Sequence, residues 1–426
     1  MKIFSLLFLL FVGAISAQAQ QNFTVDTTVD DATLSACTAA AGDCSLRGAI
    51  ARANEPGVAD TIDFVIPAYD TGCTAGGICT ITLRSGVGIG NAAATGALTI
   101  TNSTGASNLL ISGSDVSTVF FVLSGANLSL NGVTVTNGYT PCGSGGINND
   151  GILSVTNSIV SGNTGSDGGG ISNGNSGTLT LTNSTVSGNT ASGGGGIINY
   201  GTATLLNSTV SGNTATDSNG GGIYNQGTLN LTSVTVAYNS TTNPGSTGGG
   251  VFNINESPRR GTANLFNTIV ANNTSAGTAP DFSGAISPAS SFNLIGNGAG
   301  MSGITNGDAN GNQVGTPLNP IDPKLGSLAL NGGTTLTHAL LPGSPAIDQG
   351  NATGTDQRGF ARPVDNPAIA NATSGNGADI GAFEVQTANA MPTTKEQCKN
   401  GGWMNFTFPR AFKNQGDCIQ FVNTGK

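Results

Sequence analysis

Residues 168–199 read GGGISNGNSGTLTLTNSTVSGNTASGGGGIIN and contain one complete copy of a unit that repeats through the middle of the chain. Its most regular part is the string Gly-Gly-Gly-Ile-x-Asn, which occurs at 168–173, 194–199 and 220–225, with a Val variant at 248–253 and a looser copy at 145–149. The Ile or Val positions follow one another in steps of 24, 26, 26 and 28 residues. A sustained period of this length is typical of solenoid proteins.

The spacing of apolar residues inside each unit indicates β-strands. Four positions recur with gaps of two, three and two, as in Leu179, Leu181, Ser184, Val186 and again in Leu229, Leu231, Val234, Val236. A gap of two keeps residues on one face of a strand, and a gap of three marks a bend between two strands that share an interior. Coils of about 25 residues cannot bury their inner face alone and must stack on one another. We therefore predict an all-β chain folded as a parallel β-helix, right-handed by the usual crossover rule.

Composition excludes several other classes of protein. Of 426 residues, 66 are glycine, only 9% are charged, and the net charge is −9. A nucleic-acid binder needs a basic face, and a disordered chain is usually richer in charge and poorer in apolar residues. The Gly-rich strings lack the Lys and Ser/Thr of a phosphate-binding loop, so we expect no cofactor.

The first 19 residues have the features of an export signal. Met1-Lys2 is followed by an apolar run to Ile15, and Ala17-Gln18-Ala19 fits a signal-peptidase site. No later segment is apolar for long enough to span a membrane. The expectation is a secreted or cell-surface protein.

Export makes disulfides possible, and the seven cysteines include three close pairs. These are Cys37 with Cys44, Cys73 with Cys79, and Cys398 with Cys418, while Cys142 is left over. Spacing alone does not prove this connectivity. A metal site is disfavoured, because the chain has one histidine and no C-x-x-C motif.

The regions beside the repeats are predicted to close the solenoid. Residues 20–95 contain Leu46, Ala49, Ile50 and Ala53 at helical spacing after a possible N-cap, Ser45, which predicts a short helix over the first coil. We place the repeats at 96–300, the last coils and a closing region at 301–386, and a linker with a cysteine-bracketed tail at 387–426. The tail is either a small disulfide-closed fold or a docking module for an anionic or glycan surface.

Two of these regions resemble known families. Residues 44–50, Cys-Ser-Leu-Arg-Gly-Ala-Ile, resemble the CSLREA-type N-terminal domain of exported bacterial β-helix proteins, with Gly48 where that family has Glu. The Gly-Gly-Ile and Ser-Gly-Asn strings are similar to the repeats of polymorphic outer-membrane proteins. Residues 337–348, 356–360 and 379–384 resemble the choice-of-anchor Q domain, a closing module that precedes surface anchors. This resemblance implies a surface location and assigns no catalytic residues.

Catalytic chemistry on such a scaffold needs clustered acids or a strong base. The acids between residues 128 and 273 number at most one per coil, namely Asp150, Asp167, Asp217 and Glu256. Asp167 and Asp217 are predicted on one edge, two coils apart. The lone His338 is interpreted as structural. A further group of charged residues forms either an ion-pair lattice or a Ca²⁺ site: Asp348, Asp356, Arg358, Arg362, Asp365 and Asp379.

One insertion breaks the repeat and is the first candidate for partner contact. The coil that starts at Ala263 begins 34 residues after its predecessor, and the added residues include Glu256, Arg259 and Arg260. Insertions in solenoids emerge as surface loops that often carry recognition, although a neutral insertion is the alternative. The hypothesis is a non-catalytic secreted β-helix that acts as an adhesin or envelope component and contacts an extracellular glycan. The alternative is a polysaccharide lyase or glycoside hydrolase.

Overall fold

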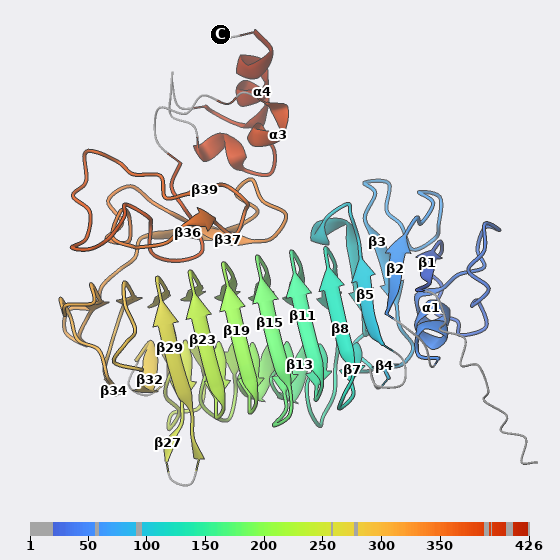
Figure 1. Ribbon diagram of the computed structural model, residues 1–426, viewed down its shortest axis with the longest axis horizontal. Helices are drawn as coiled ribbons and strands as arrows, with labels where there is room; N and C mark the ends of the chain where they lie inside the picture. The colour runs from blue at the N-terminus through green and yellow to red at the C-terminus, as the bar shows by residue number, and fades with distance from the viewer. Residues whose placement is uncertain are drawn as a thin grey trace, which may run out of the picture.

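The computed structural model describes residues 20–55, 59–90, 96–256, 259–276, 280–386, 392, 394–405 and 412–424. The export signal expected at 1–19 lies outside these residues. Four parallel sheets run along one axis (Figure 1). Each coil in the central part of the chain contributes one strand to at least three of these sheets. The predicted parallel β-helix is confirmed.

We number the sheets I to IV in the order in which a coil visits them. Sheet I contains β1 (Asn22–Val25), β2 (Asp60–Phe64), β5 (Ala97–Thr101), β8 (Asn127–Asn131), β11 (Ile152–Thr156), β15 (Thr178–Thr182), β19 (Thr202–Leu206), β23 (Thr228–Thr232) and β29 (Thr262–Phe266). Sheet II contains β3 (Cys79–Thr82), β6 (Leu109–Ser112), β9 (Thr134–Thr136), β12 (Ile159–Ser161), β16 (Thr185–Ser187), β20 (Thr209–Ser211), β24 (Thr235–Ala237), β30 (Ile269–Ala271), β33 (Leu294–Ile295) and β35 (Gln313–Val314).

The other two sheets complete the cross-section of the solenoid. Sheet III contains β13 (Thr164–Asp167), β17 (Thr190–Gly193), β21 (Thr214–Ala215), β25 (Ser240–Thr241) and β31 (Thr274–Ser275). Sheet IV contains β4 (Val87–Ile89), β7 (Phe120–Val122), β10 (Ile147–Asn149), β14 (Ile171–Asn173), β18 (Ile197–Asn199), β22 (Ile223–Asn225), β26 (Val251–Asn253), β32 (Phe282–Ala285) and β34 (Met301–Ser302).

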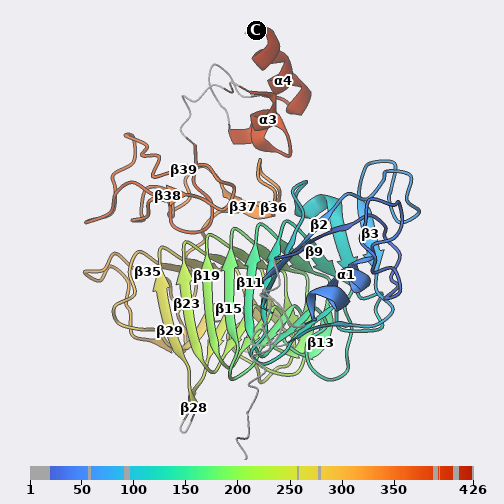
Figure 2. The same ribbon diagram turned by 45° about the vertical axis from the view of Figure 1, so that its right-hand side comes forward.

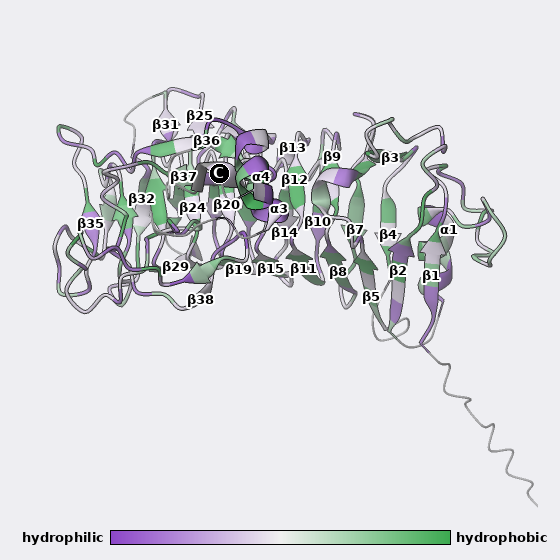
Figure 3. Ribbon diagram, turned by 90° about the horizontal axis from the view of Figure 1, so that it is seen from above, coloured by the Kyte–Doolittle hydropathy of each residue, from purple (hydrophilic) through white to green (hydrophobic). Residues whose placement is uncertain are grey.

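The two-three-two pattern lines the interior, as predicted. Leu179 and Leu181 of β15 and Val186 of β16 are completely buried, and Ser184 between them is buried too. The chain turns from sheet I to sheet II at Asn183, whose φ is 51°. Asparagine accepts this left-handed conformation better than most residues, which explains why Asn recurs at this bend. Hydrophobic residues of the solenoid accordingly concentrate in its strands (Figure 3).

Two ladders of buried asparagines run along the axis. At the end of sheet IV each side-chain amide donates to the next coil's Oδ1 over 2.6–2.8 Å, in the order Asn149, Asn173, Asn199, Asn225, Asn253. The Asn of each Ile-x-Asn string therefore stacks on its equivalent in the next coil. The second ladder follows sheet II and was not foreseen, with members Asn163, Asn189, Asn213, Asn239, Asn273 and Asp281.

The N-terminal helix forms where the sequence predicts it. α1 spans Leu46–Ala53, and the Ser45 side chain accepts a hydrogen bond from the Gly48 backbone as its N-cap. A Cβ at Gly48 would meet the Leu34 carbonyl, so the residue that departs from the CSLREA motif is required by close packing. Disulfides join Cys37 to Cys44, directly before this helix, and Cys73 to Cys79 at the start of β3, and Cys142 is free and exposed.

Residues 325–386 fold back over the outer face of sheet II, above the solenoid in Figure 1. This closing region contains two small antiparallel pairs, β36 (Leu325–Ala329) with β37 (Thr337–Leu340) and β38 (Gly354–Thr355) with β39 (Ala361–Arg362). Gln357 connects it to the solenoid, because its side chain accepts a hydrogen bond from Thr209 and donates to Thr185.

The tail lies on the far side of the closing region from the solenoid (Figures 1 and 2). It contains α3 (Lys395–Cys398), a 3₁₀ turn (Gly402–Asn405) and α4 (Gln415–Thr424), and the Cys398–Cys418 disulfide joins the two helices. Phe412 and Phe421 pack on this disulfide as a small core. In the part of the chain that is described, no helix has both the length and the apolar character needed to cross a membrane.

Candidate functional site

Residues at one outward register position of sheet IV form a row along the solenoid, in which Tyr224 and Phe252 are aromatic neighbours and Ile198 is buried. Parallel register places Ser172, Ile198, Tyr224, Phe252 and Ser283 at the same position of successive coils. The rings of Tyr224 and Phe252 are both partly exposed, with centroids 5.2 Å apart and a tilt of 35°. The x position of each Ile-x-Asn string therefore supplies one outward residue to this row.

The corner that follows sheet IV adds polar and aromatic groups beside these rings. Gln226 donates a hydrogen bond of 3.0 Å to the Tyr224 hydroxyl, which holds the ring on the surface. Tyr200 occupies the equivalent corner one coil earlier and is half-buried. We call Tyr200, Tyr224, Gln226 and Phe252 the aromatic edge.

The charged insertion emerges at the same corner, one coil further along. β27 (Asn255–Glu256) and β28 (Arg259–Arg260) pair as an antiparallel hairpin, in which Glu256 lies opposite Arg259. The hairpin projects from the solenoid on the side opposite the closing region (Figures 1 and 2). Arg260 is exposed, so this insertion presents a guanidinium close in sequence to Phe252.

Together these groups can make apolar, hydrogen-bonding and ionic contacts with a ligand. Aromatic faces pack against apolar faces of a ligand, and amide and hydroxyl groups exchange hydrogen bonds with its polar groups. A guanidinium pairs with carboxylates in a bidentate geometry. Arg259 and Arg260 are the only basic residues between Arg84 and Lys324, so positive charge on this long stretch is confined to the hairpin.

The acids considered for catalysis lie at different corners of the solenoid. Asp150 is exposed after sheet IV, whereas Asp167 and Asp217 are exposed at sheet III, two coils apart as predicted. Each of these latter two accepts a hydrogen bond from its neighbour, Ser166 or Thr216. The structure therefore does not bring Asp150 together with the other two.

His338 lies in the interface between the closing region and sheet II. Its ring nitrogens are 2.8 Å from the Ser211 hydroxyl and 2.7 Å from the Gly326 carbonyl, and its ring packs on Tyr238. Burial lowers the pKa of this imidazole, partly offset by the bond to Gly326. The residue has the structural role that was assigned to it.

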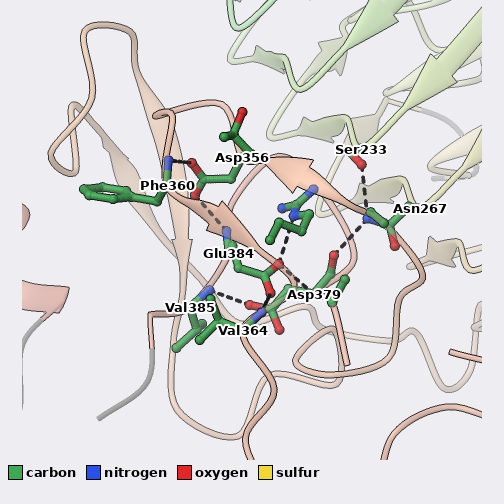
Figure 4. A network of polar contacts seen from close by, with 12 residues as sticks. Ser233, Asn267, Asp356, Phe360, Val364, Asp379, Glu384 and Val385 are labelled. Carbon is green, nitrogen blue, oxygen red and sulfur yellow. Dashed lines mark hydrogen bonds and ion pairs between the residues drawn. The ribbon is translucent and has the colours of Figure 1, made fainter. Parts of the chain in front are cut away.

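The charged group of the closing region forms an ion-pair lattice (Figure 4). Arg358 pairs with Asp356 over 2.6 Å and Arg362 pairs with Glu384 over 2.9 Å, and all four side chains are fully buried. Burial raises the pKa of Glu384 to about 7, since desolvation outweighs the attraction of Arg362. Among the described residues, no group of three or more His, Cys, Asp or Glu side chains is placed to hold a metal ion.

The second half of the lattice joins it to the solenoid. The Asp379 carboxylate accepts hydrogen bonds from the backbone of Asp348 and Val385, while its carbonyl accepts one from Asn267 of the last regular coil. Burial, with repulsion from Glu384, raises the pKa of Asp379 well above its usual value. Of the six charged residues grouped from the sequence, Asp356, Arg358 and Arg362 form ion pairs, the last of them with Glu384, which lies outside that group.

Comparison with known proteins gives one similar solved structure. No family model matches the chain, and no curated protein matches it. The crystal structure of pectate lyase Pel9A is similar over 87% of this chain and 98% of that one, with 17% sequence identity and a TM-score of 0.40. At this identity the likeness concerns the fold alone and transfers no residue roles.

This finding contradicts the expectation that the chain is not an enzyme, because the similar protein is a lyase. Counting acids along the sequence was an insufficient argument because the coils stack on one another. Coils about 4.8 Å apart bring side chains of several coils together, so one acid per coil does not exclude catalysis.

Proposed function

We propose that this chain binds an acidic polysaccharide outside the cytosol, with the aromatic edge and the β27–β28 hairpin as the contact surface. The observation that carries the proposal is the partly exposed Tyr224–Phe252 pair beside the hairpin that bears Arg259 and Arg260. Aromatic rings take the apolar face of a sugar, and guanidinium groups pair with uronate carboxylates.

The disulfides support the proposed location outside the cytosol. Three disulfides are typical of proteins that fold in an oxidising compartment. With the signal-like N-terminus, they support a secreted or surface-exposed protein, which is where polysaccharides of walls and matrices are found. Cleavage of the bound chain by a lyase or hydrolase mechanism would use the same recognition surface, so activity is measured alongside binding.

The proposal predicts a loss of affinity when the aromatic pair is removed. A Tyr224→Ala/Phe252→Ala variant should bind oligogalacturonate at least about tenfold more weakly than the native chain, which corresponds to about 1.4 kcal/mol. Isothermal titration with a defined oligomer measures this change, and formation of reducing ends in the same samples reports cleavage. Tyr139→Ala is the matched control, because Tyr139 is 42% exposed and lies away from this surface.

Charge is tested separately at the hairpin. Arg259→Gln/Arg260→Gln should weaken binding of the acidic oligomer and reduce its dependence on salt, because fewer ionic contacts remain to be screened. Equal affinity of the native chain and both double variants would refute the assignment of this surface.

A further inference from the structure

A pocket of about 650 Å³ lies where the last coils meet the closing region, away from the aromatic edge. One wall is the loop that contains Asn306, Asp308 and Gln313, and the other comes from segments 344–349 and 369–373 of the closing region. A cleft of this volume is in the range of small-molecule sites.

Hydrogen-bond acceptors dominate the polar lining. Gln313 donates its amide to the Pro345 carbonyl, and Gln349 donates to the carbonyls of Asp348 and Ala370. Each glutamine thus uses its NH₂ group inside the protein, and within the described residues its Oε1 has no hydrogen-bond partner. These two oxygens are oriented by the protein and remain available to a ligand that donates.

One donor lies on the same wall as Gln313. The Asn306 Oδ1 accepts a hydrogen bond from the Val314 backbone, so its NH₂ group is left for a ligand. Pro345, Ile347 and Ile369 add an apolar patch to the same lining. Two acceptors, one donor and an aliphatic surface match a polyhydroxylated ring better than a purely apolar molecule.

The charge of the pocket excludes acidic ligands. Its lining contains no Lys or Arg, and its one charged residue is Asp308. Burial raises the pKa of Asp308, but hydrogen bonds from Asn312, Thr305 and Asn310 outweigh it and hold the pKa below its usual value. An ionised carboxylate in a cation-free pocket repels a uronate.

We propose that this pocket binds a neutral saccharide, whose hydroxyls donate to Oε1 of Gln313 and Gln349 and whose C–H face packs on Ile347 and Ile369. The site is separate from the aromatic edge and does not depend on the function proposed there. It would give the protein a second sugar specificity, for uncharged units.

The test uses cellotriose, maltotriose and xylotriose as neutral probes and trigalacturonate as the acidic one. Binding to the full chain is measured by saturation-transfer NMR and by titration calorimetry. At least one neutral trisaccharide should bind, and Thr373→Trp, an exposed position on the pocket lining, should weaken that binding at least tenfold. Leu318→Trp is the matched control, because Leu318 is 91% exposed and does not line the pocket.

A second variant removes the Gln349 side-chain amide. Gln349→Met keeps the side-chain length but removes Oε1 together with the NH₂ group that bonds to the Asp348 and Ala370 carbonyls, and it should also weaken binding of the neutral ligand. The Tyr224→Ala/Phe252→Ala variant should leave that binding unaffected. Failure of all three neutral sugars to bind, or full binding by Thr373→Trp, would overturn the pocket assignment. Loss of trigalacturonate binding would concern the aromatic edge and not the pocket. Each of the two proposals can therefore be refuted without the other.

Discussion

Asn213 shows how one buried side chain connects three coils. Its Oδ1 accepts hydrogen bonds from the backbone and the side chain of Asn189, and its Nδ2 donates to the Val186 carbonyl and to Asn239. All four bonds are buried, where an unpaired polar group is costly. The ladder thus satisfies backbone groups that the corner after sheet II leaves without partners.

Replacing this amide should be strongly destabilising. Asn213→Ala leaves the buried Asn189 backbone N–H without its acceptor and removes the bonds to Asn239 and to the Val186 carbonyl, and should lower the free energy of unfolding by about 3 kcal/mol. Urea titration measures the change. Asn175→Ala, at an exposed loop position, should stay within about 0.5 kcal/mol. Similar losses in both variants would contradict a specific role for the ladder.

Asp281 gives the ladder a dependence on pH. Burial raises the pKa of this carboxyl to about 6, although hydrogen bonds from Asn273 and Asn297 offset part of the effect. The folded state binds the proton more tightly than the unfolded state does. The contribution of Asp281 to the free energy of unfolding is therefore fully present below pH 4. It is lost as the pH rises through 6.

The comparison with Asp281→Asn isolates this contribution. The free energy of unfolding of the native chain, relative to that of the variant, should fall by about 2.5 kcal/mol between pH 4 and pH 7.5, since each pKa unit is worth about 1.4 kcal/mol and a small part is already lost at pH 4. Urea titrations at the two pH values provide the measurement. A difference that does not change with pH would show that Asp281 titrates normally.

At the scale of the strand, β19 places two adjacent leucines in opposite environments. Leu205 is completely buried, whereas Leu206 is 38% exposed on the outer face of sheet I. Leu205→Ala should cost about 3 kcal/mol of unfolding free energy through the cavity it leaves, and Leu206→Ala less than about 1. A reversed order in urea titration would mean that the strand register is shifted by one residue.

The strands were the part of the structure that the sequence predicts best. Their inner faces follow from the positions equivalent to Leu179, Leu181, Ser184 and Val186, since a period of two on each side of a bend admits few other folds. The corner ladder at Asn173 and Asn199 was likewise predictable from an Asn that recurs in each coil. The ladder through Asn189 is predictable in the same way, because an Asn also recurs in each Ser-Gly-Asn string.

The whole molecule depends on contacts that no local pattern reveals. The closing region covers sheet II through bonds such as Gln357 with Thr209, which join residues 148 positions apart. The aromatic edge likewise arises only when Tyr224 and Phe252 are stacked, because each is a single variable residue within its own coil. Composition and spacing therefore predicted the solenoid and the charged insertion, but not the aromatic edge that lies beside this insertion.

The central claim is that parallel stacking gathers the outward residues of sheet IV into one straight row. Spin labels at Asn148→Cys and Ser283→Cys, in a Cys142→Ser background, lie in this row five coil spacings apart. Double electron–electron resonance should give a single narrow distance distribution near 24 Å, five times the spacing of about 4.8 Å between parallel strands. A broad distribution, or a distance well outside that value, would contradict the stacked row and with it the proposed binding surface.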